Sequence, residues 1–157
     1  NMIARLLCKW PMAICAAPDY LKSQGEPQNL HELSQHKCVL DSNLSSGNNW
    51  TFNTNNGEFK SIAVSSNLSS NNPQAVVNMV KAGAGIGIMA KNSVINELQH
   101  GNLVELFTQY NALSLDIYLI YPHKKHISQK LQCFIDFMIE KFSTPFDNLC
   151  INSLTKR

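Results

Sequence analysis

The sequence has no hydrophobic run long enough to cross a membrane. A membrane-spanning helix needs roughly 18 uninterrupted apolar residues, whereas residues 12–17 form only a strand-length apolar run. Trp10 and Pro11 interrupt the one candidate hydrophobic region near the start, so the chain does not open like a signal peptide. These absences predict a soluble protein without a membrane partner.

Paired cysteines are also missing. The five cysteines are an odd number, none is spaced as Cys-x-x-Cys, and four lie next to apolar residues; they are Cys8, Cys15, Cys38, Cys133 and Cys150. A disulfide framework needs an even set, and structural zinc sites need close pairs. The pattern therefore predicts buried, reduced thiols and a cytoplasmic location.

The chain has little charge of either sign. Charged residues make up 15% of the sequence, the formal net charge is only +2, and Lys124 and Lys125 are the only adjacent basic pair before the last residues. A nucleic-acid surface needs clustered basic residues, so we do not expect this segment to bind DNA by itself. The hydrophobic fraction of 44% is too high for intrinsic disorder and predicts a packed core.

Catalytic motifs are absent or incomplete. Ser34 and Lys37 match the Ser-x-x-Lys pattern of penicillin-binding enzymes, but the companion motifs are missing, as is a Gly-x-Ser-x-Gly elbow. Gly83, Gly85 and Gly87 follow a helix and precede a strand, which is the reverse of the order in a dinucleotide-binding loop. We interpret the three glycines as structural, and the chain as a binding protein and not an enzyme.

Metal-binding and cofactor-binding patterns are incomplete as well. Two groups of side chains could each supply two or three ligands, namely His123 with His126, and His31 with His36 and Cys38. A structural zinc site needs four ligands, and no further Cys or His completes either set. We therefore expect surface histidines, no metal and no cofactor.

Helical and strand patterns alternate along the chain. The clearest helix begins at Asn72, which can cap it, has Pro73 at its first position, and ends at Gly83. Further helices are predicted at residues 18–25, 93–100 and 128–142, and a short one around Leu30 and Leu33 after a capping box of Asn29 and Glu32. Strands are predicted at 12–17, 37–41, 85–89, 103–107 and 115–121. A hairpin is predicted over 50–64, with its turn at Asn56-Gly57. This order predicts an α/β fold with a largely parallel sheet. The nearly continuous apolar character of 115–121 predicts a strand covered on both faces.

Polar side chains follow two of the predicted elements. The segment Asp41-Ser42-Asn43 comes after a buried strand, and Asn71-Asn72 precedes the capped helix. In open parallel sheets, ligands bind beyond the carboxyl ends of the strands, where helix N-termini also converge. These residues are therefore candidates for ligand binding, and capping and turn formation alone would explain them equally well.

At these residues the chain resembles the effector-binding domain of LysR-type transcriptional regulators, from about Ile3 to Phe142. The resemblance rests on an ordered set of short segments and not on any single one. They are Ala4-Arg5-Leu6, Ala16-Ala17-Pro18-Asp19-Tyr20-Leu21 with Gly25 and Pro27, Leu33 with His36-Lys37-Cys38, Trp50 and Phe52, Asn72 through Ala75-Val76, Gly83-Ala84-Gly85-Ile86-Gly87, Gly101-Asn102-Leu103-Val104, Tyr121-Pro122, Ser128, and Phe134-Ile135-Asp136-Phe137. Two positions depart from the subgroup that it looks most like: Ala17 stands where Ser is usual, and Ala90 where Pro is usual.

The resemblance implies a two-lobed sensor with the type 2 periplasmic-binding-protein-like fold, one lobe largely complete and the other partial. Residues 1–17 would be a hinge strand with a remnant of the first lobe, 18–121 the second lobe, 122–142 the return hinge and C-terminal helix of the first lobe, and 143–157 a tail. The cleft between the lobes would hold a small anionic or polar effector. The expected effector-binding residues are Ser42, Asn43, Asn71, Asn72 and Ala17.

The resemblance also implies partners. DNA would be bound only through an N-terminal helix-turn-helix domain that this segment lacks, and the full-length regulator would form homodimers or homotetramers. A solute-binding protein of the same fold is the alternative, which an upstream signal peptide would distinguish.

Overall fold

The computed structural model describes residues 2–54, 57–112, 114–123 and 128–142. The chain divides into two compact units, one built from residues 1–10 and 114–157 and the other from residues 11–113. We call them the interrupted unit and the continuous unit. The continuous unit begins ahead of the strand at residues 12–16, whereas the second lobe is predicted to begin at residue 18. The assignment of lobes stays a prediction.

The continuous unit is built on a five-stranded sheet with the order β6-β3-β7-β2-β8. The strands are β2 (Met12–Ala16), β3 (Lys37–Asp41), β6 (Ser65–Ser70), β7 (Ile86–Ala90) and β8 (Val104–Leu106). β3 is parallel to both β6 and β7, but β2 is antiparallel to both β7 and β8. Four of the five strands therefore run in the same direction, and β2 alone runs opposite to them. The prediction of a largely parallel sheet holds for every strand except β2, whose direction apolar alternation does not report.

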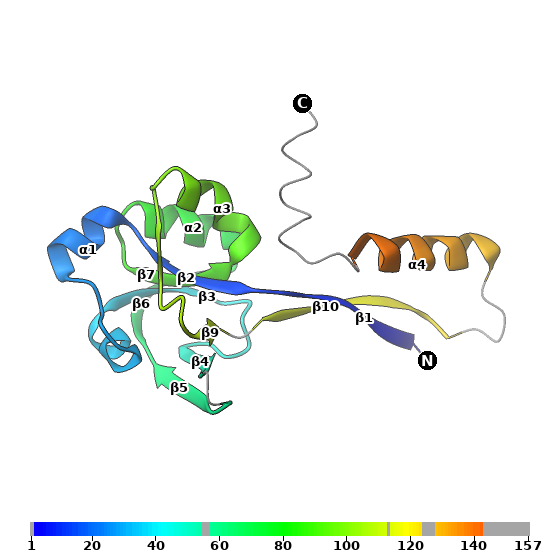
Figure 1. Ribbon diagram of the computed structural model, residues 1–157, viewed down its shortest axis with the longest axis horizontal. Helices are drawn as coiled ribbons and strands as arrows, with labels where there is room; N and C mark the ends of the chain where they lie inside the picture. Colours follow the sequence, from blue (N-terminus) through cyan, green and yellow to red (C-terminus); the bar gives the residue numbers. More distant parts are fainter. Residues whose placement is uncertain (1, 55–56, 113, 124–127, 143–157) are drawn as a thin grey trace. The chain divides into compact units, whose positions relative to one another are not determined.

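Helices α2 (Pro73–Lys81) and α3 (Lys91–Gln99) cover one face of this sheet (Figure 1). Asn72 caps α2 and Pro73 begins it, as predicted. Gly83, at a φ of 80°, follows α2 and precedes β7. A Cβ at Gly85 would clash with the Lys37 backbone, and one at Gly87 would press on Met89 and Val80, which confirms the structural role of the three glycines. The helices and the sheet enclose a cluster of buried apolar side chains: Ala13, Cys15, Val39, Val76, Val77, Val80, Met89, Val94 and Leu103.

Two shorter helices precede β3. α1 (Pro18–Gln24) starts directly after β2, and the 3-10 helix η1 (Leu30–Gln35) buries Leu30 and Leu33. The side chain of Asn29 accepts a hydrogen bond from the Glu32 backbone N–H (3.2 Å), as a cap should. Glu32 reaches back to the backbone N–H of Gln28 and not to that of Asn29, so the predicted capping box is shifted by one residue.

The predicted hairpin is present in a second, three-stranded sheet of the continuous unit. β4 (Asn49–Asn53) pairs with β5 (Phe59–Ala63) on one side and with β9 (Asn111–Ala112) on the other. Trp50 and Phe52 point to the buried side of β4 and are fully enclosed. The predicted turn residue Asn56 lies outside the described residues.

In the interrupted unit, β1 (Met2–Trp10) and β10 (Leu115–Pro122) form an antiparallel ladder, and α4 (Gln129–Phe142) follows them. The Ser128 hydroxyl accepts a hydrogen bond from the Leu131 backbone N–H (3.3 Å), as predicted for a cap. Side chains of β10 alternate between half-buried and exposed, with Ile120 60% exposed. The prediction that both faces of this strand are covered was therefore wrong, because one face of β10 is exposed.

Within the described ranges, no helix is long and apolar enough to span a bilayer.

Candidate functional site

Four of the five predicted site residues lie together at one edge of the five-stranded sheet. This edge carries Asp41–Asn43, which end or follow β3, and Ser70–Asn72, which end or follow β6; we call these residues the polar rim. Asp41 and Ser70 are register partners in the two parallel strands. The Ser42 backbone N–H donates to the Ser70 carbonyl (3.0 Å), so the ladder fixes the two segments side by side.

Asn43 ties the two segments of the rim together. Its side-chain Nδ2 donates to the Asn71 carbonyl (2.6 Å) and to Asp41 Oδ1 (2.9 Å), and its backbone N–H also donates to Asp41 Oδ1 (2.9 Å). The last contact is the turn that Asp forms with the residue two positions on. Asn43 and Asp41 are thus engaged within the rim, which leaves less of their hydrogen-bonding capacity for a ligand.

The side chain of Asn72 caps α2 through one of its atoms and leaves the other without a partner in the described ranges. Its Oδ1 accepts from the backbone N–H groups of Gln74 (2.9 Å) and Ala75 (3.4 Å), and its own backbone N–H donates to Ser70 Oγ (3.1 Å). Because Oδ1 serves the helix, Nδ2 must point away from it. Among the described residues, Nδ2 of Asn72, the Ser42 hydroxyl and the Asn71 side chain have no hydrogen-bond partner.

Ala17 is not part of the polar rim. It follows β2, which is antiparallel to β7, so the carboxyl end of β2 lies at the opposite edge of the sheet from the carboxyl ends of β3 and β6. Ala17 is only 3% exposed and lines a separate hollow of about 390 Å³ beside Lys81 and Asn102. The expectation that loops after neighbouring strands share one edge holds for the parallel strands and fails for β2.

A small cavity on the same edge as the rim was missed by the sequence analysis. It has a volume of about 120 Å³ and lies where β2 begins and where β7 and β8 end. Lys91 and Glu105 line it, and Lys91 Nζ and Glu105 Oε1 form an ion pair 3.1 Å apart. Phe107 has a φ of 58°, the one positive φ outside glycine among the described residues. Lys91 and Phe107 follow strands in the sequence, so the rule that selected Asn43 would have found them.

The charges on this edge do not fully cancel, because Asp41 has no ion-pair partner among the described residues. Asp41 is the rim's one carboxylate, and the Lys91 ammonium is offset by Glu105. The edge therefore offers hydroxyl, amide and backbone donors and no unopposed cation. Such a surface suits a small polar ligand held by hydrogen bonds.

The described residues contain no group of three or more His, Cys, Asp or Glu side chains placed to hold a metal ion. One of the predicted histidine pairs includes His126, which lies outside the described residues. Cys15 and Cys38 are buried, and burial raises the pKa of each thiol to about 12. These two side chains are protonated at neutral pH and act as small apolar groups.

Comparison with known proteins places the chain in a family. The model of the LysR substrate binding domain matches residues 1–143. The chain belongs to the LysR substrate-binding domain family. Among curated proteins, this LysR domain is 35% identical over 136 residues to the HTH-type transcriptional activator TtdR of Escherichia coli K12, covering 87% of this chain and 44% of TtdR. It is 28% identical to an uncharacterized HTH-type transcriptional regulator of Haemophilus influenzae, over 83% of this chain and 45% of that protein.

Solved structures confirm the type 2 periplasmic-binding-protein-like α/β fold. The full-length Vibrio cholerae virulence activator AphB matches with a TM-score of 0.76 and 28% identity, over 89% of this chain and 48% of AphB. The CrgA regulatory domain of Neisseria meningitidis matches in fold, with a TM-score of 0.73 and 24% identity, over 90% of this chain and 69% of that domain. This LysR domain thus spans less than half the length of the curated relatives quoted above.

Proposed function

We propose that this chain is the effector-sensing part of a LysR-type transcription regulator, and that a small polar or weakly anionic metabolite binds at its polar rim. The observation that carries the proposal is the set of unpaired donors that β3 and β6 bring together, Nδ2 of Asn72 and the hydroxyl of Ser42. The family supports ligand sensing, and the two curated relatives quoted above are HTH-type transcription regulators and not solute-binding proteins.

The rest of the protein follows from the same proposal. DNA is bound by an N-terminal helix-turn-helix domain in the full-length regulator, which acts in the cytoplasm as a homodimer or homotetramer. The ligand leaves the site chemically unchanged, since the rim has donors and acceptors but no group placed as a nucleophile with its base. Effector binding then changes how the regulator acts at its promoter.

The decisive experiment separates the two roles of Asn72 in the full-length regulator. Aspartate is as good a cap as asparagine, so Asn72→Asp keeps the helix but replaces the free Nδ2 donor with a negative charge. We expect this variant to fold with unchanged stability and to bind the effector about 5–150-fold more weakly, the effect of losing a hydrogen bond of ~1–3 kcal/mol. Asn72→Ala should also lose affinity and, in addition, about 1 kcal/mol of stability from the lost cap.

Asn29→Ala is the matched control, because Asn29 caps η1 and is not part of the rim. It should lose stability without losing affinity. Calorimetry with a panel of acetate, succinate and citrate measures binding, and chemical unfolding measures stability. Unchanged affinity in Asn72→Asp would assign Asn72 to capping alone and remove the rim from the effector site.

A further inference from the structure

A further hollow lies at the end of β3 that is remote from the polar rim. It is a groove of about 360 Å³, within the size range of small-molecule sites. The β3–β6 groove, as we call it, is lined by Ser34, Gln35, His36, Lys37, Cys38, Ser65, Ser66, Asn67, Leu68 and Ala84. β3 runs from Lys37 in the groove to Asp41 in the rim, so one strand connects the two places.

The groove exists because the pairing of β3 with β6 is irregular there. Lys37 pairs with Ser65, and the next pair is Val39 with Leu68, so β6 has one residue more than β3 over this stretch. The side chain of Ser66 takes over part of the lost ladder, accepting from the Leu68 backbone N–H (3.1 Å) and donating to the Leu68 carbonyl (2.7 Å). Bulges of this kind redirect side chains and are common beside functional sites.

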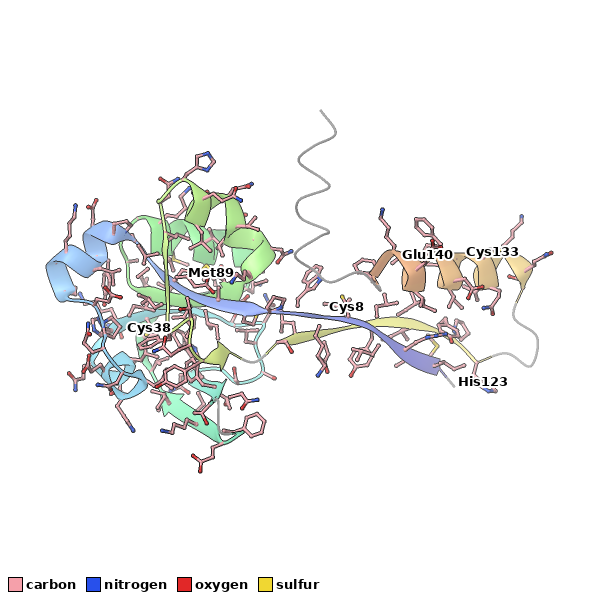
Figure 2. The ribbon with its side chains drawn as sticks, in the orientation of Figure 1. Cys8, Cys38, Met89, His123, Cys133 and Glu140 are labelled. Carbon is pink, nitrogen blue, oxygen red and sulfur yellow. The ribbon has the colours of Figure 1, made fainter. Side chains whose placement is uncertain are left out.

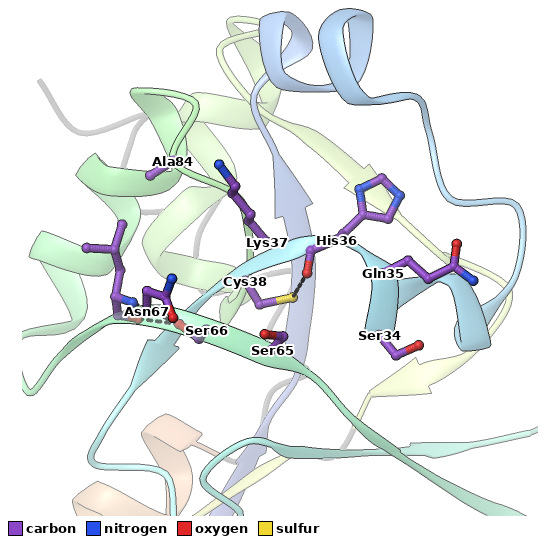
Figure 3. A pocket seen from close by; sticks show the side chains of 10 residues that line it. Ser34, Gln35, His36, Lys37, Cys38, Ser65, Ser66, Asn67 and Ala84 are labelled. Carbon is purple, nitrogen blue, oxygen red and sulfur yellow. Dashed lines mark hydrogen bonds between the residues drawn. The ribbon is translucent and has the colours of Figure 1, made fainter.

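Several polar side chains around the groove are unpaired among the described residues. Gln35, Lys37, Ser65 and Asn67 have no side-chain hydrogen bond or ion pair within the part of the chain that the structure describes. Figure 3 shows Lys37 extending toward Ala84, with Ser65 beside Cys38 in the middle and Gln35 on the opposite side. Donors therefore converge on the groove from β3, from β6 and from the end of η1.

The groove is positive and has no acid to offset it. Lys37 is its one lysine or arginine, and its lining contains no Asp or Glu. The His36 ring is hydrogen-bonded to Tyr20, with Nδ1 3.1 Å from the Tyr20 hydroxyl. Cys38 is only 2% exposed, and burial raises the pKa of its thiol to about 12, so it forms a neutral floor. This differs from the rim, whose one charged side chain is the Asp41 carboxylate.

We propose that the β3–β6 groove is a second ligand site, which binds a small carboxylate- or phosphate-bearing compound through Lys37 with hydrogen bonds from Ser65, Asn67 and Gln35. The proposal does not depend on the effector site at the rim. The groove lies at one end of β3 and the rim at the other. A ligand bound in the groove is therefore placed to shift the position of the rim, as a co-effector would.

The test uses this 157-residue chain and nuclear magnetic resonance titrations with inorganic phosphate, succinate and glycerol. We expect at least one of the two anions to shift the amide signals of residues 37–39 and 65–68 and to saturate below about 10 mM, whereas glycerol should not. Lys37→Gln should weaken that binding at least about tenfold. Both Lys37 and Lys60 are exposed, so Lys60→Gln on β5 is the matched control and should bind as the unchanged chain does.

The two anions distinguish the sources of the ligand. Saturation by phosphate alone points to a phosphate-bearing compound, and saturation by succinate alone to a carboxylate. Equal weakening by Lys37→Gln and Lys60→Gln would mean screening of general surface charge and overturn the proposal. So would shifts confined to the rim, or no saturation by either anion. Circular dichroism of each variant confirms that it is folded.

Discussion

At the scale of single residues, the sequence predicted which side chains gather at the rim but not how they are used. Ser42, Asn43, Asn71 and Asn72 follow neighbouring parallel strands and do meet. The side-chain amide of Asn43 donates hydrogen bonds to Asp41 and Asn71, whereas Nδ2 of Asn72 has no partner among the described residues. This difference depends on side-chain rotamers, which a sequence pattern does not predict. Ala17 was expected to bind the effector only from the family resemblance, and it lies at the opposite edge of the sheet because β2 is antiparallel to β7.

The thiols give a prediction at this scale. Cys133 lies on α4 (Figure 2) and is exposed, whereas Cys15 and Cys38 are buried in the continuous unit. Burial raises the pKa of both buried thiols to about 12. Since the thiolate is the reactive form, iodoacetamide at pH ~8 should modify Cys133 rapidly and leave Cys15 and Cys38 intact in the folded chain.

Mass spectrometry of the digested protein measures each site, and the same reaction in denaturant, where all cysteines react, is the control. Alkylation of Cys38 at the rate of Cys133 in folded protein would contradict its burial.

Burial of these thiols also makes the stability of the fold depend on pH. A thiol pKa raised from its ordinary 9.0 to about 12 contributes stability below pH 9, which is lost as pH rises from about 9 towards 12.

At the scale of elements, strongly patterned segments were predictable and polar or context-dependent ones were not. α2 has a cap, a proline and one apolar face, and each local preference agrees with the structure. β6 was missed because Ser65–Ser70 contains one apolar residue, and only its pairing with β3 makes it a strand. α3 starts at Lys91, two positions before the predicted Ser93, because Ala90 caps it without a side-chain hydrogen bond.

The packing of α2 against α3 leads to a prediction about acid stability. Glu97 on α3 accepts from Lys81 on α2 (2.7 Å) and from Asn102 (2.8 Å), and these hydrogen bonds lower the pKa of the Glu97 carboxyl. A lowered folded-state pKa contributes stability above the unfolded pKa, and the contribution is lost as pH falls through the folded value. Glu97→Gln should therefore be less stable than the parent at pH ~7, with the difference shrinking below pH ~4.

Urea unfolding at a series of pH values measures this difference. Glu58→Gln is the control, because the Glu58 side chain has no ion pair among the described residues. A gap between Glu97→Gln and the parent that stays constant from neutral to acid pH would show that the carboxylate's charge is not the source of its contribution.

At the scale of the whole molecule, the two units differ in how well they bury their apolar surface. The continuous unit encloses nearly all of the buried core, whereas in the interrupted unit Ile135 is the one fully buried side chain described. The exposed apolar face of the β1–β10 ladder is formed by Met2, Leu6, Tyr118 and Ile120, which share a face because Leu6 pairs with Tyr118 and Ala4 with Ile120.

An exposed apolar face of this kind drives association. We expect the isolated chain to self-associate and to bind a hydrophobic dye, and the double variant Leu6→Ser with Ile120→Ser to do both less. Phe59→Ser is the matched control, since Phe59 is 68% exposed but lies on β5. Size-exclusion chromatography with light scattering gives the mass. A monodisperse monomer that binds no dye would count against an unpartnered face.

The way the interrupted unit is split along the chain has a kinetic consequence. Trp10 pairs with Leu115, and the whole continuous unit lies between them in the sequence. Pairing β1 with β10 in an unfolded chain closes a loop of roughly a hundred residues, at an entropic cost on the order of 4 kcal/mol beyond a constant term. Residues 11–113 form one continuous segment, so they can fold without first closing a loop of that length. Loop entropy therefore favours a sequence of events in which the inserted segment folds first and the flanking strands find each other afterwards.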